Sequence, residues 1–206
     1  LIQADRDSRL RGGHGNALAQ AYVHAILPLA SARDQQTLLR WGLSDFERRF
    51  ARKAEALWLP ETGCDRATLR RLIDHGMKFA ILAPGQAAKV RAPSGEWLDV
   101  SKGGLDTRRA YRWSDERGRG LALFFYDGTL SQAVAFGKLM AHADAAAERI
   151  DGCFEPKTDG QLVSIATDGE TYGHHEKFSE MGLAHLAVEE LPKRGPSGIV
   201  HGFQLW

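Results

Sequence analysis

Short apolar runs alternate with helix-like segments along most of this chain. The apolar runs lie at 54–59, 79–83, 121–126 and 162–167, and each is followed at once by a Pro or an Asp, residue types that commonly end strands. Strands that alternate with helices build a mainly parallel sheet or a barrel. We therefore expect an α/β protein whose functional side chains gather at the carboxyl ends of the strands.

Helical periodicity predicts helices over 15–30, 34–51, 66–75, 131–150 and 177–191. In the second of these, apolar residues recur every three or four positions, and arginines occupy the opposite face. Asp65 is a candidate cap for the third helix, and Gly76 is a candidate residue just past its end. Pro28 should end or kink the first helix because it lacks a backbone N–H.

Residues 86–119 interrupt this alternation. They are rich in Gly, Lys, Arg and Ser and hold only short apolar runs. This pattern predicts an inserted loop region with a hairpin or two, and not a separate domain. After Pro192 only loop signals remain. We expect one domain over 1–191, followed by an irregular tail over 192–206.

Charge and cysteine content exclude several classes of protein. The formal net charge is +1, which leaves no electrostatic footprint for a nucleic acid or an anionic membrane. Two cysteines are too few for a disulfide framework, and no apolar run approaches the ~18 residues of a membrane span. The charged first residues lack the apolar stretch of a signal peptide, so we expect a cytoplasmic location. The composition does not define the oligomeric state.

Acidic residues follow three of the predicted strands. Glu61, Asp127 and Asp168 each come just after one of the apolar runs. A carboxylate at such a place often caps a helix or a turn, and the Gly after Asp127 favours that interpretation there. Glycoside hydrolysis also uses two carboxylates, which can lie on neighbouring strand ends. One is the nucleophile or base, and the other is the general acid. Glu61 and Asp168 are the candidate pair.

The histidines offer a competing interpretation. Asp168, His174 and His175 lie within eight residues, and sets of Asp and His bind divalent metals that generate hydroxide. His174 and His175 are adjacent, however, so on a helix they would point about 100° apart and would not easily share one ion. Further candidates for such a set are His14, His24 and His201.

Aromatic rings are relevant to sugars because a ring face packs against the apolar face of a pyranose. Trp58, Tyr172 and Trp97 are candidates for this contact. The alternative for each is packing in the core or in a hairpin, which we expect for Trp97. His24 lies in a predicted apolar helix, where a histidine is more often a satisfied core residue than a ligand.

Three segments resemble signature regions of glycoside hydrolase family 57. Asp168-Gly-Glu-Thr-Tyr-Gly-His-His resembles the fourth region, which carries the general acid/base. Leu57-Trp-Leu-Pro-Glu61 resembles the third region, which ends in the nucleophile. Residues 15–29, with His24 ahead of Ile-Leu-Pro, look like the second region, and 175–191 look like the helix after the fourth. The phrases Gly-Asn-Ala-Leu-Ala-Gln-Ala-Tyr and Phe-Phe-Tyr-Asp-Gly resemble a bacterial subgroup of that family.

This resemblance implies an incomplete (β/α)7 TIM-like barrel that acts on an oligo- or polysaccharide. Members of the family hydrolyse, transfer or branch α-1,4-linked glucans by retaining chemistry, without a metal or another cofactor. The resemblance assigns the nucleophile to Glu61 and the general acid/base to Asp168. It also assigns a set of expected substrate-binding residues: His24, Trp58, Glu170, Tyr172 and His174.

The chain departs from the family pattern at its amino end. The family's first region, a His-containing strand, has no counterpart here, and the chain begins without Met. We therefore expect a piece of a longer protein that lacks the first strand or two of the barrel; a complete small domain with trimmed ends is the alternative. Two further functions stay open. One is a metal-dependent hydrolase or deacetylase that uses Asp168 with His174 or His175, and the other is a non-catalytic, truncated glycan-binding piece.

Overall fold

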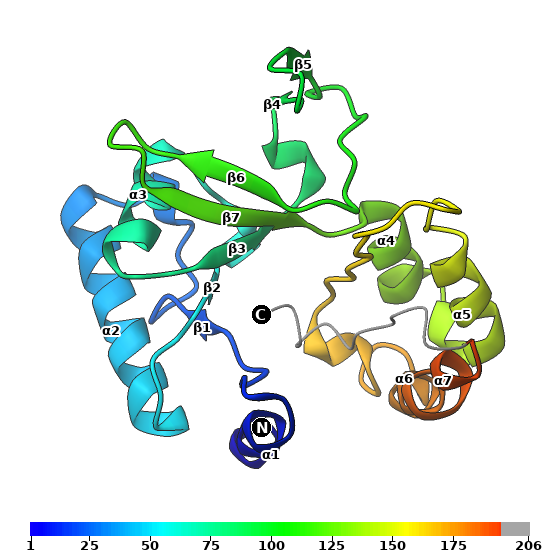
Figure 1. The fold of residues 1–206 in the computed structure, drawn as a ribbon. Coiled ribbons are helices and arrows are strands. Elements are labelled where there is room, and N and C mark those ends of the chain that lie inside the picture. Colours follow the sequence, from blue (N-terminus) through cyan, green and yellow to red (C-terminus); the bar gives the residue numbers. More distant parts are fainter. Residues whose placement is uncertain (195–206) are drawn as a thin grey trace. The chain divides into compact units, whose positions relative to one another are not determined.

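The computed structural model describes residues 1–194, and Figure 1 shows the fold as a ribbon. The chain divides into two compact units. The first consists of Leu1–Leu105 and Ala110–Phe125. The second consists of Asp106–Arg109 and the described residues from Tyr126 onward. Within residues 1–194, every helix is too short or too polar to cross a membrane.

Parallel strands form the centre of the first unit. Its sheet strands are β1 (Ala19–Gln20), β2 (Leu57–Trp58), β3 (Phe79–Leu82), β6 (Tyr111–Ser114) and β7 (Gly120–Phe125). β1 pairs with β2 and β3 with β7, both in parallel, and a parallel bridge between Ala56 and Phe79 joins β2 to β3 (Figure 1). β6 pairs with β7 in the antiparallel direction. These pairings confirm an α/β fold, while closure into a (β/α)7 barrel stays a prediction.

The helices of the first unit are α1 (Ile2–Gly12), α2 (Ala32–Phe50) and α3 (Arg66–Asp74). α2 confirms the amphipathic helix predicted over 34–51, because Leu39 and Phe46 of its apolar stripe are buried. α3 begins where it was expected, since the Asp65 carboxylate accepts a hydrogen bond from the Thr68 N–H at 2.7 Å. Gly76 follows its end with φ 77°, a left-handed conformation that suits glycine.

Leucines dominate the core of the first unit. Those with less than 2% exposure include Leu27, Leu39, Leu57, Leu59 and Leu72. Burial of one such side chain is worth about 1.5–3 kcal/mol. Leu57 and Leu59 point into this core on either side of Trp58. They therefore anchor the strand from which Glu61 emerges.

The inserted region contains the hairpins that its composition predicted. β4 (Lys89–Arg91) and β5 (Trp97–Asp99) form one antiparallel hairpin, and β6 forms a second with β7. The Trp97 side chain lies on the first hairpin and is 63% exposed. Of the two placements expected for Trp97, core or hairpin, the structure has the hairpin.

The second unit is helical. Its elements are α4 (Gly128–Phe136), α5 (Ala143–Asp151), α6 (Ser179–His185), a π-helical segment (Leu186–Glu190) and α7 (Leu191–Lys193). The last three elements run almost continuously, as the helix predicted over 177–191 requires. A separate apolar core includes Leu130, Val134, Met140, Ile150 and Leu186. Each unit thus has a core of its own.

The helix predicted over 15–30 is wrong. The segment is mostly irregular, with β1 and a 3₁₀ turn at Leu27–Leu29. Its backbone bonds to other elements, because the Ala19 N–H donates to Ala56 O at 3.1 Å and the Tyr22 N–H donates to Leu38 O at 3.1 Å. Tertiary pairing of this kind outweighs a local spacing of apolar residues that happens to match a helix.

The long helix predicted over 131–150 is interrupted. α4 ends at Phe136 with Gly137 as its cap, and Lys138 has a left-handed backbone with φ 54°. A 3₁₀ turn, Leu139–Ala141, then leads into α5. Glycine is a poor residue for a helix interior and a common residue at a helix end, so Gly137 is the sequence signal for this break.

The strand predicted over 162–167 is not formed as a regular ladder. Its backbone groups find separate partners: the Leu162 N–H donates to Arg108 O at 2.9 Å, and Ser164 O accepts from the Asp127 N–H at 2.8 Å. The tail predicted from residue 192 is also wrong at its start, because Pro192 lies in α7. The rest of that tail beyond residue 194 lies outside the described residues.

Candidate active site

A strained turn carries Glu61 at the carboxyl end of β2. Leu59 and Pro60 are buried, and a 3₁₀ turn, Pro60–Thr62, follows directly. Glu61 and Thr62 have φ values of 54° and 50°, so two successive non-glycine residues adopt the left-handed region. Each such residue costs on the order of 1–3 kcal/mol, and such strain concentrates at functional sites. The turn leaves the Glu61 carboxylate exposed to solvent.

Neighbouring groups hold this turn in place. The Thr62 N–H donates to Leu59 O at 2.9 Å, and the Thr62 side chain is buried. At Gly63 a Cβ would lie 2.9 Å from the Ile26 side chain, so the segment after β1 packs tightly against the turn. The segments that match the second and third family regions are thus in contact.

His24 and Glu61 meet at this end of the strands. His24 Nε2 lies 3.0 Å from Glu61 Oε1, although 37 residues separate the two in sequence. β1 and β2 bring them together, since Gln20 pairs with Trp58 and each chain then continues past the same edge. Both side chains are 67% exposed. The alternative of His24 as a core histidine is therefore wrong.

Trp58 and Cys64 flank the Glu61 turn. Trp58 ends β2 and is partly buried, beside Gln20 of β1. Burial raises the pKa of the Cys64 thiol to about 11, with a smaller contribution from the Asp65 carboxylate. The thiol therefore stays protonated near neutral pH and is a poor nucleophile. Glu61 is the better candidate for nucleophilic chemistry at this edge.

Asp127 and Asp168 differ in what their carboxylates do. Asp127 caps α4, because its Oδ1 accepts a hydrogen bond from the Leu130 N–H at 2.7 Å. This confirms the capping role expected for Asp127. Asp168 precedes the 3₁₀ turn Gly169–Thr171, yet its side chain makes no capping bond to any residue that the structure describes. The Asp168 carboxylate is exposed and available for other contacts.

Hydrogen bonds to other residues of the second unit hold the loop after Asp168 in place. Thr171 is buried, and Thr171 O accepts a hydrogen bond from Ser179 Oγ at 2.9 Å. The Gly173 N–H donates to the same Ser179 Oγ at 3.2 Å. Tyr172 is half-buried, and its hydroxyl accepts from Thr167 Oγ1 at 3.0 Å. Ser179 was not among the residues singled out from the sequence; its place at the start of a predicted helix was the available signal.

The remaining predicted residues lie on this same loop. Glu170 is exposed, and Glu170 O accepts from the His175 N–H at 2.9 Å. His174 and His175 are exposed, with ring centroids 5.0 Å apart. Within residues 1–194, no three His, Cys, Asp or Glu side chains are grouped so that they could hold a metal ion. His201, another candidate ligand, lies outside the described residues.

The structure therefore assembles the predicted residues in two groups. His24, Trp58 and Glu61 meet at the carboxyl ends of β1 and β2 in the first unit. Asp168, Glu170, Tyr172 and His174 share one loop of the second unit. The first group is brought together by strand pairing, and the second by closeness in sequence.

Comparison with known families decides what these groups belong to. The sequence model described as glycosyl hydrolase family 57 matches residues 10–201, a range that contains both groups. The chain belongs to glycosyl hydrolase family 57. No curated protein matches this family 57 chain.

Several solved structures share the fold of this family 57 chain. An exo-type maltose-forming amylase from a Pyrococcus species is similar with 19% identity and a TM-score of 0.70, over 88% of this chain and 29% of that one. A family 57 branching enzyme from Thermococcus kodakaraensis is similar with 16% identity and a TM-score of 0.68, over 94% and 47%. A 4-α-glucanotransferase from Thermococcus litoralis is similar with 15% identity and a TM-score of 0.63, over 87% and 26%.

These likenesses concern the fold, since identities below 20% say little about individual side chains. The family 57 chain spans less than half the length of each of the three proteins. The similarity in fold is consistent with the parallel pairing of β1 with β2 and of β3 with β7. It also agrees with the family that the three sequence motifs resemble.

Proposed function

We propose that this chain is part of a retaining glycoside hydrolase or glucanotransferase that acts on α-1,4-linked glucans. Glu61 is the nucleophile and Asp168 is the general acid/base. The observation that carries the proposal is the contact of His24 with Glu61 on a strained turn at a strand end. Family membership supports the glycan substrate, because the similar structures include an amylase, a branching enzyme and a glucanotransferase.

In the first step a Glu61 oxygen attacks the anomeric carbon of the glucan. The bond from that carbon to the glycosidic oxygen breaks, and Asp168 gives its proton to the leaving oxygen. A covalent glycosyl–enzyme ester forms on Glu61. In the second step Asp168 takes a proton from the acceptor, whose oxygen attacks the same carbon and releases the Glu61 carboxylate. Water as the acceptor gives hydrolysis, and a sugar hydroxyl gives transfer.

The neighbouring side chains orient these groups. His24 Nε2 lies 3.0 Å from Glu61 Oε1, so a proton on this nitrogen holds one carboxylate oxygen and leaves the other for attack. Trp58 offers a ring face beside Glu61. In the second unit Tyr172, Glu170 and His174 bind the sugar around Asp168. The uncapped Asp168 carboxylate, in contrast to that of Asp127, supports a role in chemistry.

The architecture that goes with this function is a partial (β/α)7 barrel in a cytoplasmic enzyme. β1, β2, β3 and β7 are parallel neighbours, which is the arrangement that one wall of such a barrel requires. Their carboxyl ends carry the turns and loops, as in other barrels where active sites occupy that face. Two carboxylates about 5–5.5 Å apart are expected in a retaining site.

Substitution of the two carboxylates tests the proposal. Asp168→Asn is expected to lower kcat on maltooligosaccharides by at least ~10²-fold, since general acid–base catalysis contributes about 10²–10⁴-fold. Glu61→Gln is expected to lose at least as much, because the neutral amide cannot form the glycosyl ester. Asp168→Asn should lose less rate on an aryl glucoside, whose leaving oxygen needs little protonation. The measurement is steady-state hydrolysis and transfer with the protein that contains this chain.

Asp127→Asn is the matched control. Asp127 also follows a strand, but it caps α4, and Asn caps a helix about as well as Asp. The control should therefore keep its activity. Wild-type rates for Glu61→Gln would overturn the assignment, as would an equal loss in Asp127→Asn.

A further inference from the structure

The hairpin of β4 and β5 begins at the same sheet edge as the Glu61 turn. A parallel bridge between Ala56 and Phe79 joins β2 to β3, so the carboxyl ends of these two strands lie at one edge. At this edge β2 leads into Glu61, and β3 leads into a 3₁₀ turn, Pro84–Gln86, from which the hairpin follows (Figure 1). Both turns belong to the first unit. The hairpin therefore starts at the edge where active sites of parallel α/β folds are found.

The base of the hairpin is attached beside the Glu61 turn. Cys64, three residues after Glu61, donates from Sγ to Gln86 Oε1 at 3.9 Å. Ala87 and Leu105, on the two sides of the hairpin, both pack on the core of the first unit, as Cys64 does. The start and the end of the segment that carries the hairpin are thus tied to the core that supports the proposed nucleophile.

Hydrogen bonds fix the hairpin at both of its ends. Near its base, the Val100 N–H donates to Ala88 O at 2.9 Å, and the Val100 side chain is buried. At its tip, the Ala92 N–H donates to Glu96 O at 2.8 Å, and the Gly95 N–H donates to Ala92 O at 2.8 Å. Gly95 has φ 93°, a left-handed backbone that suits glycine in a tight turn. The side chains of β4 and β5 therefore keep defined directions.

One face of the hairpin presents the Trp97 ring to solvent. Cross-strand pairing and alternation place four side chains on this face: Lys89, Arg91, Trp97 and Asp99. Leu98 lies on the opposite face. The Trp97 side chain is 63% exposed and makes no ring–ring or cation–ring contact within residues 1–194. A large ring held in solvent on a fixed hairpin offers its apolar surface to a ligand.

Polar groups with fixed directions accompany this ring. Asp99 Oδ1 accepts from the Ser101 N–H at 2.9 Å and from Ser101 Oγ at 2.6 Å, which orients the carboxylate and leaves Oδ2 for another donor. Arg91 Nε donates to Gly95 O at 3.0 Å, and the other guanidinium N–H groups remain for an acceptor. A pyranose has an apolar ring face and a rim of hydroxyl groups. Trp97, Asp99 and Arg91 match both parts.

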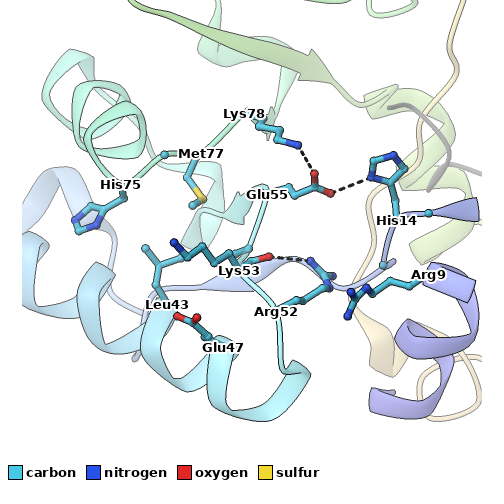
Figure 2. Close-up of a pocket in the computed structure, with 14 residues that line it drawn as sticks. Arg9, His14, Leu43, Glu47, Arg52, Lys53, Glu55, His75, Met77 and Lys78 are labelled. Atoms are coloured by element: carbon cyan, nitrogen blue, oxygen red, sulfur yellow. Dashed lines mark hydrogen bonds and ion pairs between the residues drawn. The ribbon is translucent and has the colours of Figure 1, made fainter.

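Charged groups at the opposite, amino-terminal edge of the strands pair with one another. Glu55 precedes β2 and Lys78 precedes β3, and the two form an ion pair. His14 Nδ1 lies 3.4 Å from the same Glu55 carboxylate (Figure 2). These contacts join the starts of the strands and have a structural role. The exposed ring of Trp97, in contrast, belongs to the hairpin at the edge that carries Glu61.

We propose that Trp97 stacks against a glucose ring of the bound α-glucan, outside the position of the reacting sugar. Asp99 and Arg91 hydrogen-bond to hydroxyl groups of the same ring. Trp97 pairs with Arg91, which lies four residues beyond Ala87, or roughly 13 Å at about 3.3 Å per residue. The contact is therefore made a few sugars along the chain from the cleaved bond, and it favours longer glucans. This inference rests on the proposed function and adds a preference for chain length to it.

Calorimetric titration with maltoheptaose and maltotriose tests the contact in the protein that contains this chain. Every protein tested carries Glu61→Gln, so that the ligand is not consumed. Addition of Trp97→Ala should weaken maltoheptaose binding about tenfold, and maltotriose binding much less, because the shorter ligand does not reach the hairpin. Trp97→Phe should keep most of the affinity, since its ring also stacks. Leu98→Ala, on the opposite face, is the matched control and should bind as the parent does.

Other results would overturn the contact. Unchanged maltoheptaose binding in Trp97→Ala would mean that the ring does not touch the glucan. Equal losses for the two ligands, or an equal loss in Leu98→Ala, would mean that the hairpin only supports the fold. Circular dichroism establishes that each variant is folded before titration. If the parent Glu61→Gln protein itself binds no maltoheptaose, the proposed function fails as a whole, so the two failures are distinguishable.

Discussion

The turn at Glu61 and Thr62 places backbone strain at the proposed nucleophile. Their left-handed backbones require support, which the buried Thr62 side chain and the packing of Ile26 against Gly63 provide. The result is an exposed carboxylate whose direction is set by the core beneath it. His24 then fixes one of its two oxygens.

Removal of the His24 ring tests this positioning role. His24→Ala should lower kcat about 10–100-fold and leave KM nearly unchanged, because the hydrogen bond orients Glu61 and does not bind the leaving group. His24→Gln should recover part of the loss, since its amide can donate to the same oxygen. His142→Ala, which removes an exposed histidine of the second unit, is the control. A uniform rise in KM with unchanged kcat would contradict this account.

A buried ion pair stabilises the first unit at another point. Asp5 has no exposed surface, and its carboxylate receives two hydrogen bonds from Arg52 and one from the Ala17 N–H. The Arg52 guanidinium holds the pKa of Asp5 below its ordinary value of 3.8, against the opposing effect of burial. This stabilisation is therefore present above pH 4 and is lost as the pH falls through the lower pKa of the folded state.

Arg52→Met should lower the free energy of unfolding by about 3–5 kcal/mol at pH 7, because Asp5 stays buried without its partner. The loss should shrink as the pH falls toward 3, since a protonated Asp5 needs no cation. Urea unfolding at pH 7, 5 and 3.5 measures both effects, with exposed Arg48→Met as the control. A pH-independent difference between Arg52→Met and the wild type would argue against the pairing.

At the scale of elements, the position of α2 depends on one close approach. A Cβ at Gly42 would lie 2.0 Å from Gln20 O and 3.0 Å from Tyr22 N, so the helix packs directly on the backbone of β1 and the residues after it. The same helix buries Leu39 and Phe46 in the core. β1 leads to His24, and α2 therefore supports one side of the candidate site.

Gly42→Ala should destabilise the first unit by about 1–3 kcal/mol, because the added methyl group forces α2 away from β1. The displacement should also reduce kcat, since it disturbs the contact of His24 with Glu61. Thermal unfolding and activity measured together provide the test. Gly85→Ala has open space around its Cβ and serves as the control. Equal effects of the two substitutions would contradict the packing argument.

Across the whole molecule, periodicity predicts helices and strands, whereas the motifs predict functional residues. The helix over 34–51 and the strand over 79–83 were predicted well, because each carries a strong local pattern and a capping or breaking residue. The helix predicted over 15–30 is wrong, because the backbone of this segment bonds to β2 and to Leu38 of α2. No local pattern encodes those contacts. Strand pairing likewise explains why the contact between His24 and Glu61 was not visible in the sequence.

The motifs identified the chemistry-bearing residues without locating them. Glu61 and Asp168 could be selected because each follows an apolar run and matches a family motif. The capping of α4 by Asp127 is local and follows from the sequence, whereas the contact of His24 with Glu61 and the support of the Asp168 loop by Ser179 depend on tertiary contacts. Such contacts join residues from different elements, so a linear pattern does not contain them.

A trapped glycosyl–enzyme would identify the nucleophile of this protein. The protein that contains this chain is incubated with 5-fluoro-α-glucosyl fluoride, which slows hydrolysis of the intermediate, and is then digested and analysed by mass spectrometry. We expect one fluoroglucosyl adduct, on Glu61, and none in Glu61→Gln. An adduct on a different carboxylate, or release of product with inverted configuration and no adduct, would contradict this assignment.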